Sequence, residues 1–266
     1  MKLANKVVVV TGAGNGLGRE LTRQLVTRGA RVAAVDINAD GLKETLAALA
    51  SSSVADFALS VADKEAVDAL PAQVIARFGS VDGVINCAGV LHPFAPFHTL
   101  EWSAIERVLD VNLKGTLHVL RAFLPHLLAR PEGHVLNIAS MGGFIAVPGQ
   151  TIYCASKAAV KLLTEGIHFE LLKTNVRVSL ALPGALETNI LTNSGIPVPP
   201  GAANMPAPLV TSAPSAAKQI LDGMEANAYH ILVGRDAKLM NAFNRLSPRR
   251  AAATIAKQLG ELLNVG

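Results

Sequence analysis

The sequence predicts an α/β protein with one doubly wound parallel sheet, folded as a single domain over residues 1–266. Seven short apolar runs recur along the chain: "KVVVVTG", "ARVAAVD", "VADFALS", "VDGVINCAG", "GHVLNIAS", "VRVSLALPG" and "YHILVG". Runs so continuously apolar are typical of strands covered on both faces. The segments between them have helical spacing, as at Leu17, Leu21 and Leu25. Strands that alternate with helices imply right-handed parallel crossovers, which give this fold.

The composition is that of a soluble globular protein, with 50% apolar and 17% charged residues. No apolar run approaches the roughly 18 residues that a membrane span requires, and the start "MKLANKVVVV" is too short an apolar stretch for a signal peptide. We therefore expect a cytoplasmic protein. The two cysteines, Cys87 and Cys154, show neither metal-ligand spacing nor a disulfide framework, so we expect both to be reduced packing residues.

The stretch "VVVVTGAGNGLGRE", residues 7–20, combines a hydrophobic strand, a glycine-rich turn and the start of a helix. A helix N-terminus offers free N–H groups and partial positive charge, which suits a pyrophosphate. The spacing is not the common G-x-G-x-x-G, because Leu17 stands where the third glycine belongs.

The second predicted strand ends with Asp36, about 20 residues after the glycine turn. A carboxylate at this position accepts hydrogen bonds from an adenosine ribose and repels a 2′-phosphate. The next residue, Ile37, supplies no arginine to neutralise such a phosphate. The pattern favours NAD over NADP.

Read as T-G-x-x-x-G-x-G, the turn resembles that of the classical short-chain dehydrogenase/reductase (SDR) family, and the resemblance extends over residues 6–246. It implies a Rossmann fold, a nicotinamide cofactor and a homodimer or homotetramer. Two positions depart from the family pattern: Cys87 replaces the second asparagine of N-N-A-G, and Ser60 replaces an aspartate near the adenine. The cofactor-binding residues implied are Gly12, Asn15, Gly16, Leu17, Gly18, Asp36, Ile37, Ser60, Val61, Asn86, Ala88, Gly89, Tyr153, Lys157, Pro183, Gly184, Leu186 and Thr188.

A catalytic pair is predicted in "YCASK", where Tyr153 and Lys157 lie one helical turn apart. A nearby ammonium favours the phenolate, so we expect a lowered pKa for Tyr153 and faster oxidation as the pH rises through it. Ser140 directly follows a predicted buried strand. We therefore expect it at the carboxyl ends of the strands, where ligands bind in doubly wound folds. The resemblance makes Ser140 the substrate-oxygen ligand and Tyr153 the proton carrier, with Lys157 holding the ribose and Asn112 placing a proton-relay water.

The segment 189–212 contains no charged side chain, and we expect a long irregular loop there. One interpretation is a lid that, with Phe144, Ile145 and Val147, closes an apolar pocket for an uncharged secondary alcohol or ketone. The other is a loosely ordered loop packed on the domain. His92 and His98 lack further ligands nearby, so no metal site is predicted.

The net charge of +4 lies entirely in residues 235–266, which hold six basic and two acidic residues. A charge confined to one tail argues against a nucleic-acid-binding surface. Leu239, Met240, Phe243 and Leu246 predict one amphipathic face, and a second apolar segment contains Ile255, Leu259, Leu262 and Leu263. We favour packing over the active-site mouth or a subunit contact for this tail, with an anionic membrane surface as the alternative.

Two rival functions remain open from the sequence. A 3-oxoacyl thioester reductase of lipid metabolism would share the same motifs, although Asp36 and the uncharged loop argue against a phosphorylated carrier and NADPH. A catalytically silent nicotinamide-binding scaffold would share the fold, although the intact Ser140, Tyr153 and Lys157 argue against it.

Overall fold

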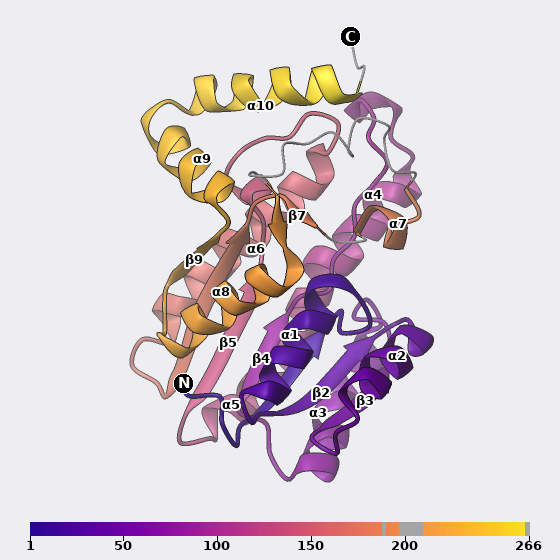
Figure 1. Ribbon diagram of the computed structural model, residues 1–266, viewed down its shortest axis with the longest axis vertical. Helices are drawn as coiled ribbons and strands as arrows, with labels where there is room; N and C mark the ends of the chain where they lie inside the picture. Colours follow the sequence, from indigo (N-terminus) through magenta and orange to yellow (C-terminus); the bar gives the residue numbers. More distant parts are fainter. Residues whose placement is uncertain (188–189, 197–209, 264–266) are drawn as a thin grey trace.

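The computed structural model describes residues 1–187, 190–196 and 210–263, and its centre is a sheet of seven parallel strands (Figure 1). The strand order is β3-β2-β1-β4-β5-β6-β9. The strands are β1 Val7–Thr11, β2 Arg31–Asp36, β3 Val54–Ala58, β4 Gly83–Asn86, β5 Gly133–Ile138, β6 Val176–Pro183 and β9 His230–Val233. Each of the seven apolar runs forms one of these strands, which confirms the predicted doubly wound fold.

Helices cover both faces of the sheet, which explains why the strands are apolar at consecutive positions. In β1, Val8 and Val10 pack into the core on one face while Val7 and Val9 pack into the core on the other, and all four are fully buried. The first face carries α1 Gly16–Thr27, α2 Ala39–Leu49 and α8 Ala213–Glu225. The second carries α3 Lys64–Phe78, α5 Gly115–Leu128 and α6 Thr151–Glu170.

The order of the strands places a crevice at the carboxyl ends of the sheet. The chain runs outward from β1 through β2 to β3, then returns to add β4 on the opposite side of β1. Ligands of doubly wound proteins bind at such a switch point. Helix α1 begins in this crevice, and Asn15 caps it by accepting a hydrogen bond from the Gly16 N–H at 2.6 Å. Helix α4, Trp102–Leu109, continues through a π-helical turn, Asp110–Lys114, into α5.

Short elements connect the main ones. Two 3₁₀ turns, Phe97–Thr99 and Met141–Gly143, lie in the connections after β4 and after β5. The predicted irregular segment 189–212 is only partly irregular: it contains helix α7, Ile190–Asn193, and strand β8, Thr211–Ser212, which pairs with β7, Leu186–Glu187. Pairing with β7 gives the end of this segment the backbone partners that a free loop would lack. Residues 197–209 of the predicted lid lie outside the described part of the chain.

Two helices end the chain, α9 Arg235–Leu246 and α10 Pro248–Leu263, drawn in orange-yellow at one end of the molecule in Figure 1. Met240 and Phe243 of α9 pack with Ile255 of α10 against Ile145. Leu239 and Leu246, by contrast, are 66% and 87% exposed, so the prediction that they share this face is wrong. Leu239 and Leu246 are seven residues apart, so they lie on one side of α9. That side is separate from the one that carries Met240 and Phe243, and it faces away from the domain.

The described helices include none that is long and apolar enough to cross a membrane.

Candidate active site

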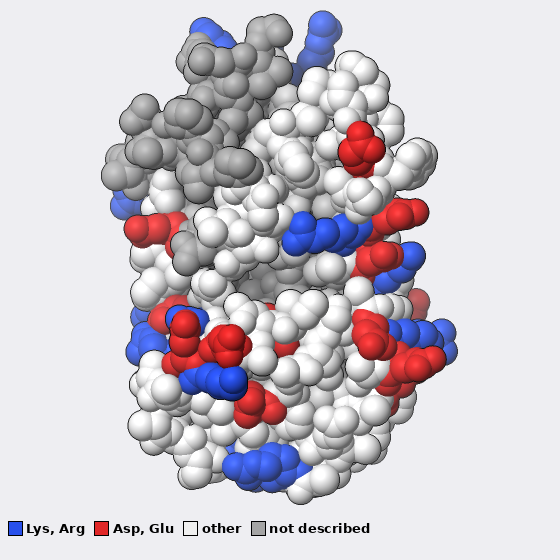
Figure 2. All heavy atoms as spheres, turned by 90° about the vertical axis from the view of Figure 1, so that its right-hand side faces the viewer, with Lys and Arg blue, Asp and Glu red and all other residues white. Residues whose placement is uncertain are grey.

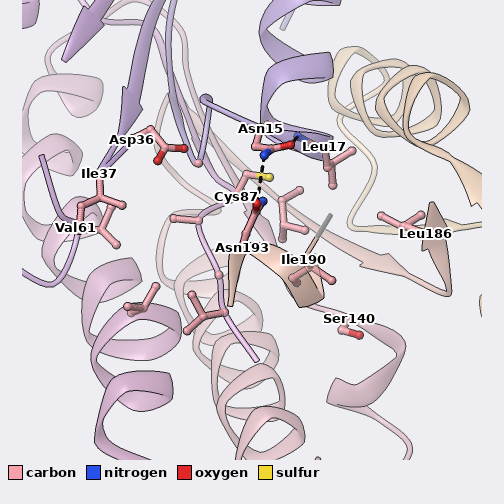
Figure 3. Close-up of a pocket in the computed structure, with 18 of the residues that line it drawn as sticks. Asn15, Leu17, Asp36, Ile37, Val61, Cys87, Ser140, Leu186, Ile190 and Asn193 are labelled. Carbon is pink, nitrogen blue, oxygen red and sulfur yellow. Dashed lines mark hydrogen bonds between the residues drawn. The ribbon is translucent and has the colours of Figure 1, made fainter. Parts of the chain in front are cut away.

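A cavity of about 420 Å³ lies in the crevice at the carboxyl ends of the strands. It corresponds to a hollow bordered mainly by uncharged residues in Figure 2. The predicted site residues that line it are Gly12, Asn15, Gly16, Leu17, Gly18, Asp36, Ile37, Ser60, Val61, Ala88, Gly89, Ser140, Tyr153, Lys157, Pro183, Gly184 and Leu186. Asn86 and Asn112 do not line it, and Thr188 lies outside the described residues. Figure 3 shows Asp36, Ile37 and Val61 at one end and Ser140 and Leu186 toward the other.

The glycine turn needs glycine at two positions for different reasons. Gly12 has a φ of +72°, a backbone conformation that favours glycine. Gly18 lies in α1, and a Cβ there would collide with the carbonyl oxygen of Gly12. The turn therefore packs directly on the first turn of the helix, and the helix N-terminus borders the cavity. This cradle fits the pyrophosphate of a dinucleotide.

Asp36 is fixed at one end of the cavity by backbone N–H groups. Its Oδ2 accepts a hydrogen bond from Gly14 at 2.8 Å, and its Oδ1 accepts one from Asn38 at 2.9 Å. Each oxygen keeps a lone pair for a ribose hydroxyl. The nearby guanidinium of Arg19 donates to the Gly14 carbonyl and pairs with Glu44 at 2.8 Å, so it is already engaged.

Ser140, Tyr153 and Lys157 come together on one wall of the cavity. Ser140 directly follows β5, and its Oγ accepts a hydrogen bond from the Gly142 N–H at 3.0 Å, so its own O–H can donate to Tyr153 or to a substrate. Tyr153 and Lys157 project from α6, with Lys157 Nζ 6.0 Å from the centroid of the Tyr153 ring. Lys157 Nζ donates to the Ile138 carbonyl at 3.0 Å, which holds the ammonium beside the end of β5.

Burial governs the acid–base properties of this wall. Desolvation raises the pKa of Tyr153 to about 12, and the Ser140 hydroxyl opposes only part of that rise. Desolvation also lowers the pKa of Lys157 to about 8. The prediction of a lowered Tyr153 pKa is therefore wrong for the cofactor-free protein, because removal from water disfavours the phenolate more than its neighbours favour it.

Asn112 lies in the π-helical turn and is fully buried. Its Oδ1 accepts from the Val90 N–H at 2.8 Å, while its Nδ2 donates to the Val90 carbonyl at 3.0 Å and to Ser156 Oγ at 3.1 Å. Gly89 separates the Asn112 side chain from Lys157, and a Cβ on Gly89 would lie 3.3 Å from Lys157 Nζ and 3.4 Å from Asn112 Oδ1. Asn112 thus anchors the strand-end backbone beside Lys157.

The "NCAG" segment is held from the neighbouring strands. Asn86 Nδ2 donates to Asn137 Oδ1 at 2.8 Å, so the Asn86 side chain bridges β4 and β5 outside the cavity lining. Thr11 Oγ1 accepts from the N–H groups of Cys87 and Ala88, both at 3.0 Å. Thr11 therefore holds the backbone at Cys87, the position where the family pattern has its second asparagine. Burial raises the pKa of the Cys87 thiol to about 12.

Several lining residues were not predicted, and they come from segments far apart in the chain. Asn15 Nδ2 donates to Asn193 Oδ1 at 3.1 Å across the cavity, as Figure 3 shows. Arg107 donates to the Ser194 carbonyl at 2.8 Å, which ties α4 to the same segment. The additional lining residues are Asn38, Leu59, Cys87, Val90, Arg107, Val111, Ile138, Ala139 and Asn193. No local pattern marks residues whose role depends on such long-range contacts.

The apolar residues expected beside the nicotinamide lie elsewhere. Ile145 is 3% exposed and packs with Met240, and Phe144 and Val147 belong to the same cluster beneath α9 and α10. None of the three lines the cavity. Of the predicted lid, Ile190 reaches the lining.

The two histidines of the 90s loop have different surroundings. His92 is 1% exposed, and its Nδ1 lies 2.7 Å from the Pro93 carbonyl, whereas His98 is exposed. Within the described part of the chain, no group of three or more histidine, cysteine or acidic side chains is arranged to hold a metal ion.

Comparison with known proteins assigns the family. The family model for short chain dehydrogenases matches residues 6–196. A Mycobacterium tuberculosis protein that carries the name "Putative oxidoreductase SadH" is 37% identical over 265 residues, which cover 95% of this chain and 96% of the relative. The chain belongs to the short-chain dehydrogenase/reductase family and is an oxidoreductase that acts on CH–OH groups with a nicotinamide cofactor.

Solved structures agree with this assignment. An SDR from Burkholderia phymatum in complex with NAD superposes with a TM-score of 0.85 at 25% identity, covering 94% of this chain and 95% of the other. An SDR from Burkholderia cenocepacia in complex with NADP gives 0.80 at 27% identity, covering 96% and 99%. A 3-ketoacyl-(acyl-carrier-protein) reductase from Brucella melitensis complexed with NADH gives 0.79 at 25% identity, covering 88% and 99%. The neighbours thus include proteins with either form of the cofactor.

Proposed function

We propose that this protein is an NAD-dependent oxidoreductase that transfers a hydride between nicotinamide and an uncharged, apolar secondary alcohol or ketone. The observation that carries the proposal is that Ser140, Tyr153 and Lys157 line the same cavity as the glycine turn and Asp36. A dinucleotide cradle and a proton-transfer group thereby face one another. The remaining predicted contact, Thr188 with the nicotinamide carboxamide, is part of this proposal.

Ser140, Tyr153 and Lys157 have different roles in the proposed proton transfer. A bound nicotinamide supplies or accepts the hydride. Ser140 donates its O–H to the substrate oxygen. Tyr153, with a pKa of about 12, is a neutral phenol at pH 7 and gives its proton to the carbonyl oxygen in reduction. In oxidation it takes that proton back, and the positive charge on Lys157 stabilises the phenolate that has to form first.

Lys157 and Asn112 assist the proton transfer by Tyr153. One N–H of the ammonium is committed to the Ile138 carbonyl, so two remain for the ribose hydroxyl and for proton relay. Asn112 uses both amide hydrogens, but its Oδ1 keeps a lone pair. We assign that lone pair to a water that carries protons between Lys157 and solvent.

The choice of NAD over NADP follows from Asp36. Its carboxylate is held by two backbone N–H groups and is not paired with a cation among the described residues, while Nε and Nη2 of Arg19 donate to Gly14 and Glu44. A 2′-phosphate there would face an unneutralised carboxylate. Asp36→Asn should therefore narrow the preference for NAD⁺ over NADP⁺ by about tenfold, measured as the ratio of kcat/KM values. A ratio equal to that of the unchanged protein would show that Asp36 does not select the cofactor.

A reductase of 3-oxoacyl thioesters is the second candidate, since a structural neighbour of that activity is complexed with NADH. Asp36 therefore does not distinguish the two functions. They can be distinguished by which substrate the protein turns over. The deciding experiment measures cofactor reduction by the purified protein on steroid, terpenoid, aromatic and 3-hydroxyacyl thioester alcohols, with Tyr153→Phe as the blank.

Three outcomes of that panel are informative. Turnover of an uncharged alcohol with NAD⁺, absent in Tyr153→Phe, supports the proposal. Turnover confined to acyl thioesters replaces it with the second candidate. NADH binding without turnover of any substrate, together with a cellular role that survives Tyr153→Phe, identifies a nicotinamide-binding scaffold.

We propose in addition that the protein is a homodimer or homotetramer that uses the outer face of α6. Leu162 and Phe169 are 70% and 62% exposed and lie seven residues apart, with the exposed Gly166 between them. Small and large apolar residues on one stripe suit close helix contact with a second copy. Leu162→Glu should shift the molecular mass measured by light scattering toward the monomer, whereas Leu239→Glu on α9 should not.

A further inference from the structure

Asp236 is a buried carboxylate that the proposed chemistry does not use. It is the second residue of α9 and is 8% exposed. Its Oδ2 accepts a hydrogen bond from the Ala185 N–H at 2.6 Å, and its Oδ1 has no partner among the described residues. A buried carboxylate that binds one backbone N–H at so short a distance holds the segment that carries this N–H.

The surroundings are shaped around this carboxylate. A Cβ on Gly184 would collide with both Asp236 oxygens, and a Cβ on Gly234, whose φ is +95°, would lie 2.5 Å from Oδ1. The same turn is held on two other sides, because Gly184 N–H donates to the Val233 carbonyl at 3.0 Å and Thr211 N–H donates to the Ala185 carbonyl at 2.9 Å.

The turn that Asp236 holds is a wall of the cavity. Pro183, Gly184 and Leu186 line it. In Figure 3, Leu186 lies away from Asp36 and toward the side of Ser140. The adenosine end, marked by Asp36, and the reacting end, marked by Ser140, therefore contact different walls. Loss of the Asp236 bond would loosen the wall at the reacting end alone.

Helix α9 also packs against the segment that follows Ser140. Met240, one turn after Asp236, packs against Ile145 and Met141, which follow Ser140. One helix thus contacts the turn that borders the cavity and the segment that follows Ser140.

We propose that Asp236 is a positioning residue that fixes the 183–186 turn against the nicotinamide half of the cofactor. The inference rests on the proposed nicotinamide site. Because it concerns one half of the cofactor, it separates NADH from ADP-ribose, which has the adenosine, pyrophosphate and second ribose but lacks the nicotinamide.

The test compares the dissociation constants of NADH and ADP-ribose, by calorimetry, for the unchanged protein and three variants. Asp236→Ala removes the acceptor and should weaken NADH about tenfold while changing ADP-ribose by no more than about twofold. Asp236→Asn keeps a neutral acceptor and should weaken NADH selectively by about threefold. The control is Asp82→Asn: Asp82 is also buried and accepts the Val7 N–H at 2.9 Å, but it pairs with Arg130 and directly precedes β4, at the amino ends of the strands and away from the cavity.

The outcomes are distinguishable. Selective loss of NADH affinity in both Asp236 variants, with Asp82→Asn unchanged in the ratio of the two constants, supports the inference. Equal weakening of both ligands, or no weakening of either, overturns it, and Asp236→Asn decides alone if Asp236→Ala does not fold. An unchanged protein that binds neither ligand overturns the proposed function together with the inference.

Discussion

At the scale of a single residue, the pKa that suits catalysis by Tyr153 and the pKa that burial gives it lie in opposite directions. Proton transfer at neutral pH is helped by a phenolate that forms easily, yet burial in the cavity wall raises the pKa of this phenol to about 12. The folded-state pKa therefore lies above the ordinary value near 10, and the phenol stays neutral over the whole physiological range. The cofactor-free protein is in the form that donates a proton, which is the form needed for reduction.

A spectroscopic titration tests this directly, because the chain has only two tyrosines. Tyrosinate absorbance of the cofactor-free protein, minus that of Tyr153→Phe, should show no Tyr153 ionisation below about pH 10. Tyr229 is the internal reference: it is half-buried, and desolvation and the nearby Glu165 raise its pKa as well. A Tyr153 signal that appears near pH 7 would show instead that Lys157 governs the phenol, as the sequence alone suggested.

The placement of a site residue in the cavity was predictable where the residue belongs to a local motif. Ser140, Tyr153 and Lys157 meet because strand end and helix spacing bring them together, and both are visible in sequence. The ionisation of Tyr153 was predicted with the wrong sign, because burial depends on the whole fold. Asn193 and Arg107 were missed, since nothing local in the sequence shows that they line the cavity.

At the scale of elements, the junction of β1 and α1 requires glycine at position 18 for packing, and the same packing forms the proposed phosphate site. Gly18 is buried against Gly12, and α1 starts two residues before Gly18. Gly18→Ala must therefore push the turn away from the helix N-terminus. Because the pyrophosphate is common to NADH and ADP-ribose, we expect both to weaken by at least about tenfold, unlike the selective loss at Asp236.

Thr27→Ala is the control for that experiment. Thr27 is the exposed last residue of α1, its hydroxyl donates to the Arg23 carbonyl of the same helix, and it does not line the cavity. Alanine there should leave both dissociation constants unchanged, measured by the same calorimetry. Normal binding of both ligands by Gly18→Ala would mean that the turn can shift without loss of the phosphate cradle.

Element types were predictable to different degrees for physical reasons. All seven strands were recognised because burial on both faces makes their sequences continuously apolar. Strand β8 was missed, because two residues paired with β7 have no pattern of their own. The buried face of α9 was assigned to four residues where Met240 and Phe243 make the contact, because a helix pattern alone does not show which of two adjacent apolar stripes meets the domain.

At the scale of the whole molecule, His134 links stability to pH. It lies within β5, fully buried, with Nε2 3.0 Å from Ser179 Oγ. Desolvation, aided by the N-terminal ammonium and Arg177, lowers its pKa to about 3. The unfolded chain binds this proton near pH 6.5 and the folded chain does not, so the folded state loses stability as the pH falls from about 6.5 toward about 3.

His134→Gln should remove that dependence, because the amide hydrogen-bonds Ser179 without titrating. We expect the free energy of unfolding of the unchanged protein to fall by up to about 1.4 kcal/mol per pH unit more steeply than that of the variant in this window. Urea unfolding at several pH values between about 7.5 and 5 measures the difference. The carboxylates, the other histidines and the termini are common to both proteins, so the difference between the curves isolates His134. Parallel curves would mean that the interior accepts the imidazolium, through water or a local opening of β5, and that the central sheet is less tightly closed than its packing indicates.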